Sequence, residues 1–98
     1  MHIILKDASK RNMSNEMRSA GYFFLEEKTG PSFVRPMGRN GYPRFHIYME
    51  KNTSKDEIII KLHLDQKRPV YQGVSAHSGE YDGKVIEAEA ARIGQILK

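Results

Sequence analysis

The sequence contains no cysteine. Disulfide bonds, thiol chemistry and structural metal sites built on thiolates are therefore excluded. Long hydrophobic runs are also missing. The strong hydrophobes 3–5 near the N-terminus are too few for a signal-peptide core, and no stretch approaches the roughly 18 apolar residues of a membrane span. We expect a soluble, cytoplasmic protein.

Acidic residues are scarce in the first half of the chain. The net charge is +4; residues 1–44 hold eight lysines and arginines against four acids, whereas residues 45–98 hold eight of each. Such an excess favours anionic partners such as nucleic acid, although ordinary solubility charge explains it equally well. The length of 98 residues suits a single domain, 1–98, with one modest core.

Two stretches, about 44–51 and 57–65, alternate between apolar and polar side chains. This alternation is typical of strands with one buried face, and the polar residues between them suit a hairpin turn. Both apolar sets must share one face, which restricts the register. If Phe45 pairs with Leu64, His46 lies directly opposite His63, on the side of the sheet that the apolar residues leave open. A slip by two residues would make the pair diagonal.

Helices are predicted on both sides of this hairpin. A short one lies near residues 14–20, with Ser14 as its N-cap and Gly21 just past its end. A longer one covers about 84–97, with Asp82 as its N-cap. Its inward stripe holds apolar residues at helical spacing, namely Ile86, Ala90, Ile93 and Leu97, widened by Val85 and Ile96.

The segments before the hairpin are less regular. Residues 3–5 can add a short strand, and residues 22–25 indicate a buried strand. Residues 29–43 are rich in proline and glycine, so we predict a loop there, anchored by Phe33, Val34 and Met37.

The predicted fold class is α+β. An antiparallel sheet with a central hairpin has one face covered by the short N-terminal helix and the C-terminal amphipathic helix. The order of helix, strand, loop, hairpin and helix resembles that of double-stranded-RNA-binding domains. Through Gly21-Tyr22 and His46-Ile47-Tyr48 it resembles, more distantly, the small HicA-like toxins, which place a histidine on a sheet after a helix and a Gly-aromatic turn.

The predicted functional surface has two parts. One is the outward face of the hairpin, and the other is the loop over residues 29–43, which carries Arg35 and Arg39. Flat rings can stack bases and cations can hold phosphates, with the outward Ile59 adding apolar area. We therefore predict a small nucleic-acid-binding domain, RNA being favoured, that needs neither a cofactor nor a metal ion. Its contact residues are Arg35, Arg39, Arg44, His46, Tyr48, Lys61 and His63.

The histidines leave two chemical alternatives open. In one, His46 and His63 are the general base and acid of a metal-independent ribonuclease, because one imidazole can be neutral and the other charged near pH 7. In the other, they join His77 or Asp65 as ligands of a divalent metal ion, since imidazoles on neighbouring strands can converge on one ion.

A non-enzymatic alternative belongs to another class. The chain would be a protein-interaction or homo-oligomerisation module, such as a homodimer. In that case Ile59, Tyr48 and Phe33 would form an apolar patch that a partner covers.

Overall fold

The computed structural model describes residues 1–28, 30–66, 79–80 and 83–97, with only the backbone described at 79–80. Within these ranges the fold has six strands, one short 3₁₀ turn and two α-helices. In chain order these are β1 (His2–Lys6), η1 (Ala8–Lys10), α1 (Met13–Ser19), β2 (Phe23–Glu27), β3 (Gly30–Pro36), β4 (Arg44–Asn52), β5 (Glu57–Asp65), β6 (Gly79–Glu80) and α2 (Lys84–Ile96).

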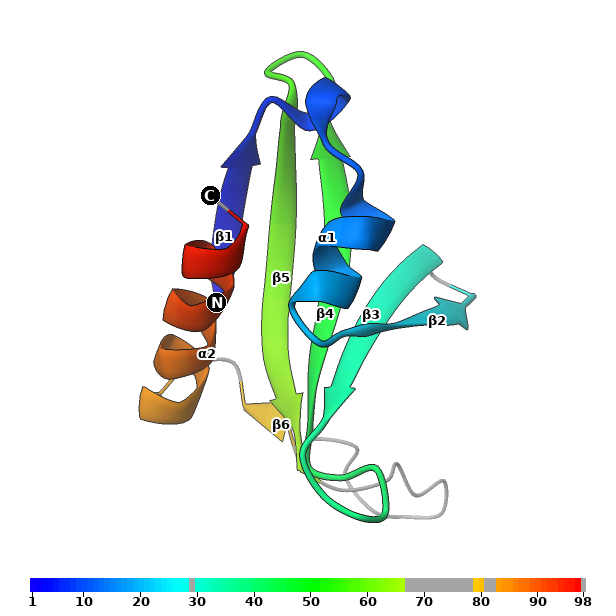
Figure 1. Ribbon diagram of the computed structural model, residues 1–98, viewed down its shortest axis with the longest axis vertical. Helices are drawn as coiled ribbons and strands as arrows, with labels where there is room; N and C mark the ends of the chain where they lie inside the picture. The colour runs from blue at the N-terminus through cyan, green and yellow to red at the C-terminus, as the bar shows by residue number, and fades with distance from the viewer. Residues whose placement is uncertain (29, 67–78, 81–82, 98) are drawn as a thin grey trace.

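The strands form one antiparallel sheet in the order β1-β5-β4-β3-β2, and the short β6 also pairs with β5. Figure 1 shows both helices on the same side of this sheet, with α2 in front of β1 and α1 in front of β4. The predicted α+β class, with helices on one face of an antiparallel sheet, is therefore confirmed. None of the helices in the described ranges is long and apolar enough to span a bilayer.

The β4–β5 hairpin has the predicted register. Phe45 pairs with Leu64 and His46 with His63, so the diagonal alternative is excluded. The apolar set on the helix side is buried, and Ile47, Ile60 and Leu62 have almost no exposed surface. This burial explains why the register is well defined, since any slip by one residue would expose these side chains.

The prediction of a loop over residues 29–43 is partly wrong, because β3 occupies residues Gly30–Pro36 and lies between β4 and β2 in the sheet. Its two prolines lie near the ends of the strand, where a missing backbone donor is tolerated. The residues between them, Ser32 to Arg35, pair with β4. Phe33 and Val34 are buried as expected, whereas Met37 is exposed.

The helices differ from prediction in their caps and in one face. The N-cap of α1 is Asn12 rather than Ser14, because its side chain accepts a hydrogen bond from the Asn15 backbone at 3.2 Å. The N-cap of α2 is Gly83, while Asp82 lies outside the described residues. On α2 the predicted stripe is buried at Ile86, Ala90, Ile93 and Leu97, Ala90 only partly; however, Val85 and Ile96 are exposed and Glu89 is buried instead.

Strand β2 is exposed where the sequence predicts burial. Tyr22, just before the strand, is buried, but Phe23 and Phe24 are 66% and 60% exposed. The reason is topological, because β2 is the last strand in the order of the sheet and residues at an edge have a neighbour on one side only. Phe24 still packs edge-on against Phe33, with ring centroids 5.7 Å apart.

Candidate functional site

The site centres on two histidines of the central strands, on the face of the sheet that α1 and α2 do not cover. His46 on β4 and His63 on β5 are directly paired, and their ring centroids are 4.8 Å apart. The rings are not open to solvent, since His46 is 3% and His63 8% exposed. The prediction that this part of the face is open is therefore wrong. Side chains that project from the same face, described next, contact both rings.

Asp65 joins the two histidines. Its Oδ2 lies 3.0 Å from His46 Nδ1, and its Oδ1 lies 2.9 Å from His63 Nε2. Arg44 Nε donates a further hydrogen bond to Oδ2 at 3.1 Å. Burial alone would raise the pKa of Asp65, but the hydrogen bonds from His46, His63 and Arg44 outweigh it and hold the pKa well below its usual range. Asp65 is therefore a carboxylate at neutral pH.

Glu27 approaches the other side of His46. Its Oε1 lies 3.3 Å from His46 Nε2, yet this buried nitrogen makes no hydrogen bond. Glu27 also acts on Tyr48, because burial together with this carboxylate raises the pKa of the Tyr48 hydroxyl to about 12. Both ring nitrogens of His46 thus face carboxylates. This suits a fixed imidazole better than one that exchanges a proton with a substrate.

The Tyr48 ring lies beside both imidazoles. Its centroid is 4.4 Å from that of His46 and 5.4 Å from that of His63, and it is nearly parallel to the His63 ring, at 11°. A ring that is stacked in this way restricts the side-chain rotamers of its neighbours. Tyr48 therefore helps to fix where the imidazole nitrogens point.

Three potential metal ligands converge here. One nitrogen each of His46 and His63 and one oxygen of Asp65 lie within 4.8 Å of one another. The predicted metal alternative named Asp65 or His77 as the third member; Asp65 is in place, and His77 lies outside the described residues.

A hollow of about 300 Å³ borders the cluster. It is lined by Met1, His2, Tyr48, Lys61, Leu62 and His63. Because two of these residues belong to the histidine cluster, the hollow gives a small solute a path to the His63 ring.

The seven predicted contact residues do not form one surface. Arg35 lies on the opposite face, where its Nη1 is 3.3 Å from Glu89, and Arg44 is occupied by Asp65 and stacks over the Tyr42 ring at 4.7 Å. Lys61 is paired with Glu50 at 2.7 Å, at the more exposed end of the site. Arg39 is exposed and makes no ion pair within the described part of the chain.

The predicted interaction patch is also divided. Phe33 is buried in the core on the helix side, since it pairs with Ile47, whereas Ile59 and Tyr48 belong to the other face. These three residues therefore cannot share one partner. The reason is the unexpected strand β3, whose alternation turns Phe33 inward.

Sequence reasoning missed Glu27. This residue reaches His46 only because β3 pairs with both β2 and β4, and the prediction of a loop removed that connection. No local pattern marks Glu27 as functional, because its neighbours Glu26 and Lys28 are charged as well. Recognition of β3 as a strand would have been the necessary signal.

No protein-family model matches the sequence, and searches of the curated proteins and of the solved structures found no match.

Proposed function

We propose that this protein binds a divalent transition-metal ion, such as Zn²⁺, through His46, His63 and Asp65. The observation that carries the proposal is the convergence of three ligand atoms within 4.8 Å on two nearly buried imidazoles and a half-buried carboxylate. Imidazole nitrogen and carboxylate oxygen are common ligands of zinc and its neighbours.

The distances around Asp65 fit this role. Two ligands held at about 2.0–2.1 Å from one ion lie about 3–3.4 Å apart. His46 Nδ1 lies 3.0 Å from Asp65 Oδ2 and His63 Nε2 lies 2.9 Å from Oδ1, so each imidazole is at ligand spacing from one oxygen of the carboxylate. Binding would replace these two hydrogen bonds with bonds to the ion, and small side-chain rotations would bring the histidines closer. Arg44 can stay on the carboxylate, because a carboxylate has lone pairs for both partners.

Glu27 supplies what a metal-binding histidine needs on its far side. Metal ligands of this type usually donate the second ring N–H to a carboxylate or carbonyl, which fixes the tautomer and orients the ring. If His46 binds the ion through Nδ1, its Nε2 carries the proton and faces Glu27 Oε1, now 3.3 Å away. The same arrangement would satisfy the buried nitrogen that has no hydrogen bond.

Three protein ligands leave at least one coordination position for water or a bound molecule. This count distinguishes catalytic zinc sites from structural ones, which use four protein ligands. A metal ion held here would make a water bound to it more acidic, which is the chemistry that such a site would supply. The hollow beside His63 provides an entry path of suitable size.

Metal titration of untagged protein, first dialysed against a chelator, tests the proposal. We expect one Zn²⁺ per chain by calorimetry and one Co²⁺ with visible absorption bands. His63→Ala and Asp65→Ala should each weaken binding more than about 100-fold, since loss of even an outer partner costs about 10–100-fold. The matched control is His2→Ala, because His2 is an exposed histidine that the ligand set does not include.

Two results would overturn the proposal. Absence of stoichiometric binding by either ion is one. The other is equal weakening by His2→Ala and His63→Ala, which would indicate nonspecific capture by surface histidines.

Nucleic-acid binding is the second candidate function. In this version the protein would contact phosphates through exposed cations, and the buried histidine rings would not stack on bases. Arg39 is exposed and Lys61 keeps 44% of its side chain exposed, so both can reach phosphates. Binding of short RNAs should then weaken steeply with salt, and Arg39→Gln should lower the salt dependence. Unchanged RNA binding in Arg39→Gln, or no binding at low salt, would remove this candidate.

A further inference from the structure

The outer edge of β2 is a second unusual surface, and it is independent of the metal proposal. This strand ends the order of the sheet, and no strand of the described residues pairs with its outer side. Figure 1 shows it at the border of the molecule, with its outer edge pointing away from the body of the sheet. Unpaired edges attract further strands, and proteins commonly protect them with charge, proline or bulges.

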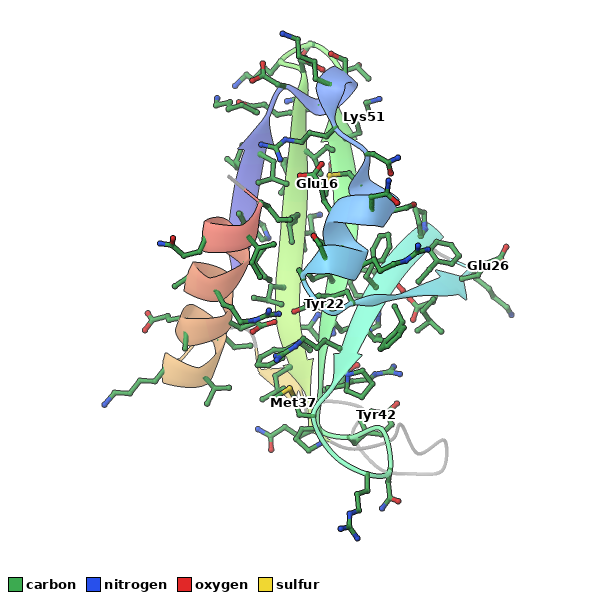
Figure 2. All side chains as sticks on the ribbon, viewed as in Figure 1. Glu16, Tyr22, Glu26, Met37, Tyr42 and Lys51 are labelled. Carbon is green, nitrogen blue, oxygen red and sulfur yellow. The ribbon has the colours of Figure 1, made fainter. Side chains whose placement is uncertain are left out.

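The first half of β2 has none of these protections. Phe23, Phe24 and Leu25 are apolar and free of proline, and both phenylalanines are more than half exposed. Glu26, which projects outward from the strand in Figure 2, and Glu27 add charge only at its C-terminal end. Such an exposed aromatic edge is typical of a site where another strand adds to the sheet.

The strand is complementary to a copy of itself. In a symmetric antiparallel pair centred on Phe24, the two Phe24 side chains face each other on the helix side. On the opposite side each Phe23 faces the Leu25 of the other copy. A shift of the centre to Leu25 would set Phe23 against Glu27 and Phe24 against Glu26. A shift to Phe23 would set Phe24 against Tyr22, which is buried in the core of its own chain. The centre on Phe24 is therefore favoured.

We propose that β2 pairs with β2 of a second copy, in an antiparallel homodimer whose two-fold axis passes beside Phe24. The two sheets then form one continuous sheet with all helices on the same side, since the axis is perpendicular to the sheet. The pairing supplies hydrogen-bond partners for outer backbone groups of residues 23–25 and covers the phenylalanines.

The dimer is weak and reversible. The contact is short, because β2 has five residues in each copy, whereas stable interfaces bury about 1,200–2,000 Å². Dissociation constants in the micromolar range or above follow. Association therefore depends on protein concentration, which makes it measurable.

Sedimentation velocity of the full chain, from about 1 µM to about 1 mM, tests association directly. We expect the weight-average mass to rise toward that of two chains, and Phe24→Asp to keep it at one chain. Val85→Asp is the matched control, because Val85 is a similarly exposed apolar residue, 54%, on α2. A wild-type monomer at every concentration, or a dimer lost equally in both variants, overturns the proposal.

Disulfide trapping tests the register. The natural chain has no cysteine, so a single introduced thiol can react only with its copy. Residues directly opposite in an antiparallel pair have Cα atoms about 4.5–5.5 Å apart, within the disulfide range. Phe24→Cys should therefore cross-link faster than Phe23→Cys, which faces Leu25, and faster than Val85→Cys. Equal rates in all three, or a faster reaction of Phe23→Cys, overturn the register; circular dichroism verifies that each variant folds.

Discussion

Two carboxylates in the described residues, one on each side of the sheet, each contact several side chains. They are Glu89 on α2 and Asp65 on β5, and their partners differ in chemistry. On the helix side Glu89, 4% exposed, accepts hydrogen bonds from the Tyr22 hydroxyl at 2.6 Å and from Arg92 at 2.8 and 2.9 Å. Arg35 completes this cluster at 3.3 Å. On the other side Asp65 is held by two imidazoles and Arg44.

The Glu89 partners keep one protonation state over the whole physiological range. The hydrogen bond to Glu89 raises the pKa of Arg92, and burial with the same carboxylate raises the pKa of Tyr22. Arginine and tyrosine are also poor ligands for zinc. Two of the Asp65 partners, in contrast, are imidazoles, which are common metal ligands. The Glu89 cluster is paired throughout and contributes to stability. In the histidine cluster, His46 Nε2 makes no hydrogen bond, and the imidazoles can bind either Asp65 or a metal ion.

The largest single loss of stability should appear when one of these carboxylates is removed. We expect Glu89→Ala to lower the free energy of unfolding by about 3 kcal/mol, because two half-buried guanidinium groups lose their counter-charge. Asp65→Ala should cost about 1–2 kcal/mol, because only one guanidinium, that of Arg44, loses its counter-charge there. Urea denaturation at pH 7 with chelator measures both. An equal or larger loss in Asp65→Ala would mean that both clusters are mainly structural.

Zinc should change the stability by slightly less than the Glu89→Ala loss, and only through the histidine cluster. At a free Zn²⁺ concentration of 100 times Kd, the wild-type protein should gain about 2.7 kcal/mol of stability. Glu89→Gln should keep this gain and Asp65→Asn should lose it. The same denaturation experiment with and without Zn²⁺ is sufficient. Retention of the gain in Asp65→Asn would exclude that residue as a ligand.

Acid should weaken the helix-side cluster. Burial alone would raise the pKa of Glu89, but hydrogen bonds from Arg92 and Tyr22 outweigh it and hold the pKa below its ordinary value. Because the unfolded chain binds the proton more readily, the contribution of Glu89 is present above the unfolded pKa of about 4.5 and is lost as the pH falls through the lower folded pKa. Denaturation between pH 7 and pH 3 should show a smaller loss in Glu89→Gln than in the wild type. Identical slopes would show that Glu89 titrates normally.

The smallest effect concerns the outer carboxylate of the histidine cluster. Glu27→Gln should weaken Zn²⁺ binding about tenfold, because a neutral amide polarises His46 less than a carboxylate does. Calorimetry measures the change, and Glu26→Gln, the adjacent exposed glutamate, is the control. Equal affinities of the two variants would show that Glu27 does not act on His46.

The hairpin and its histidine pair could be predicted from the sequence because alternation over nine residues leaves few registers. The Phe45–Leu64 pair is next to the His46–His63 pair, and burial of the apolar side chains of both strands determines the register. The buried stripe of α2 could also be predicted, because its apolar residues repeat at helical spacing. Exposure of the histidines was not predictable, since alternation states which face a side chain occupies and not what covers that face.

The contacts between residues far apart in the sequence could not be predicted without β3. Its prolines suggested a loop, and without this strand neither the contact of Glu27 with His46 nor the edge position of Phe23 could be derived. The sequence gives a weak indication of the role of Glu89, because this residue lies between Ile86 and Ile93 on the inward side of α2. A charged residue at such a position indicates a buried partner, but only the folded chain brings Arg35 and Tyr22 to it.

All three proposed ligands belong to a single hairpin, and this affects the order in which the chain can fold. His46 and Asp65 are 19 positions apart, whereas Tyr22 and Glu89 are separated by 67. Hairpins form in about 1–10 µs, while distant contacts wait for the closure of much longer loops. An ion captured between β4 and β5 would therefore join the chain before the helices dock, and would act as a template for folding as well as a constituent of the finished protein.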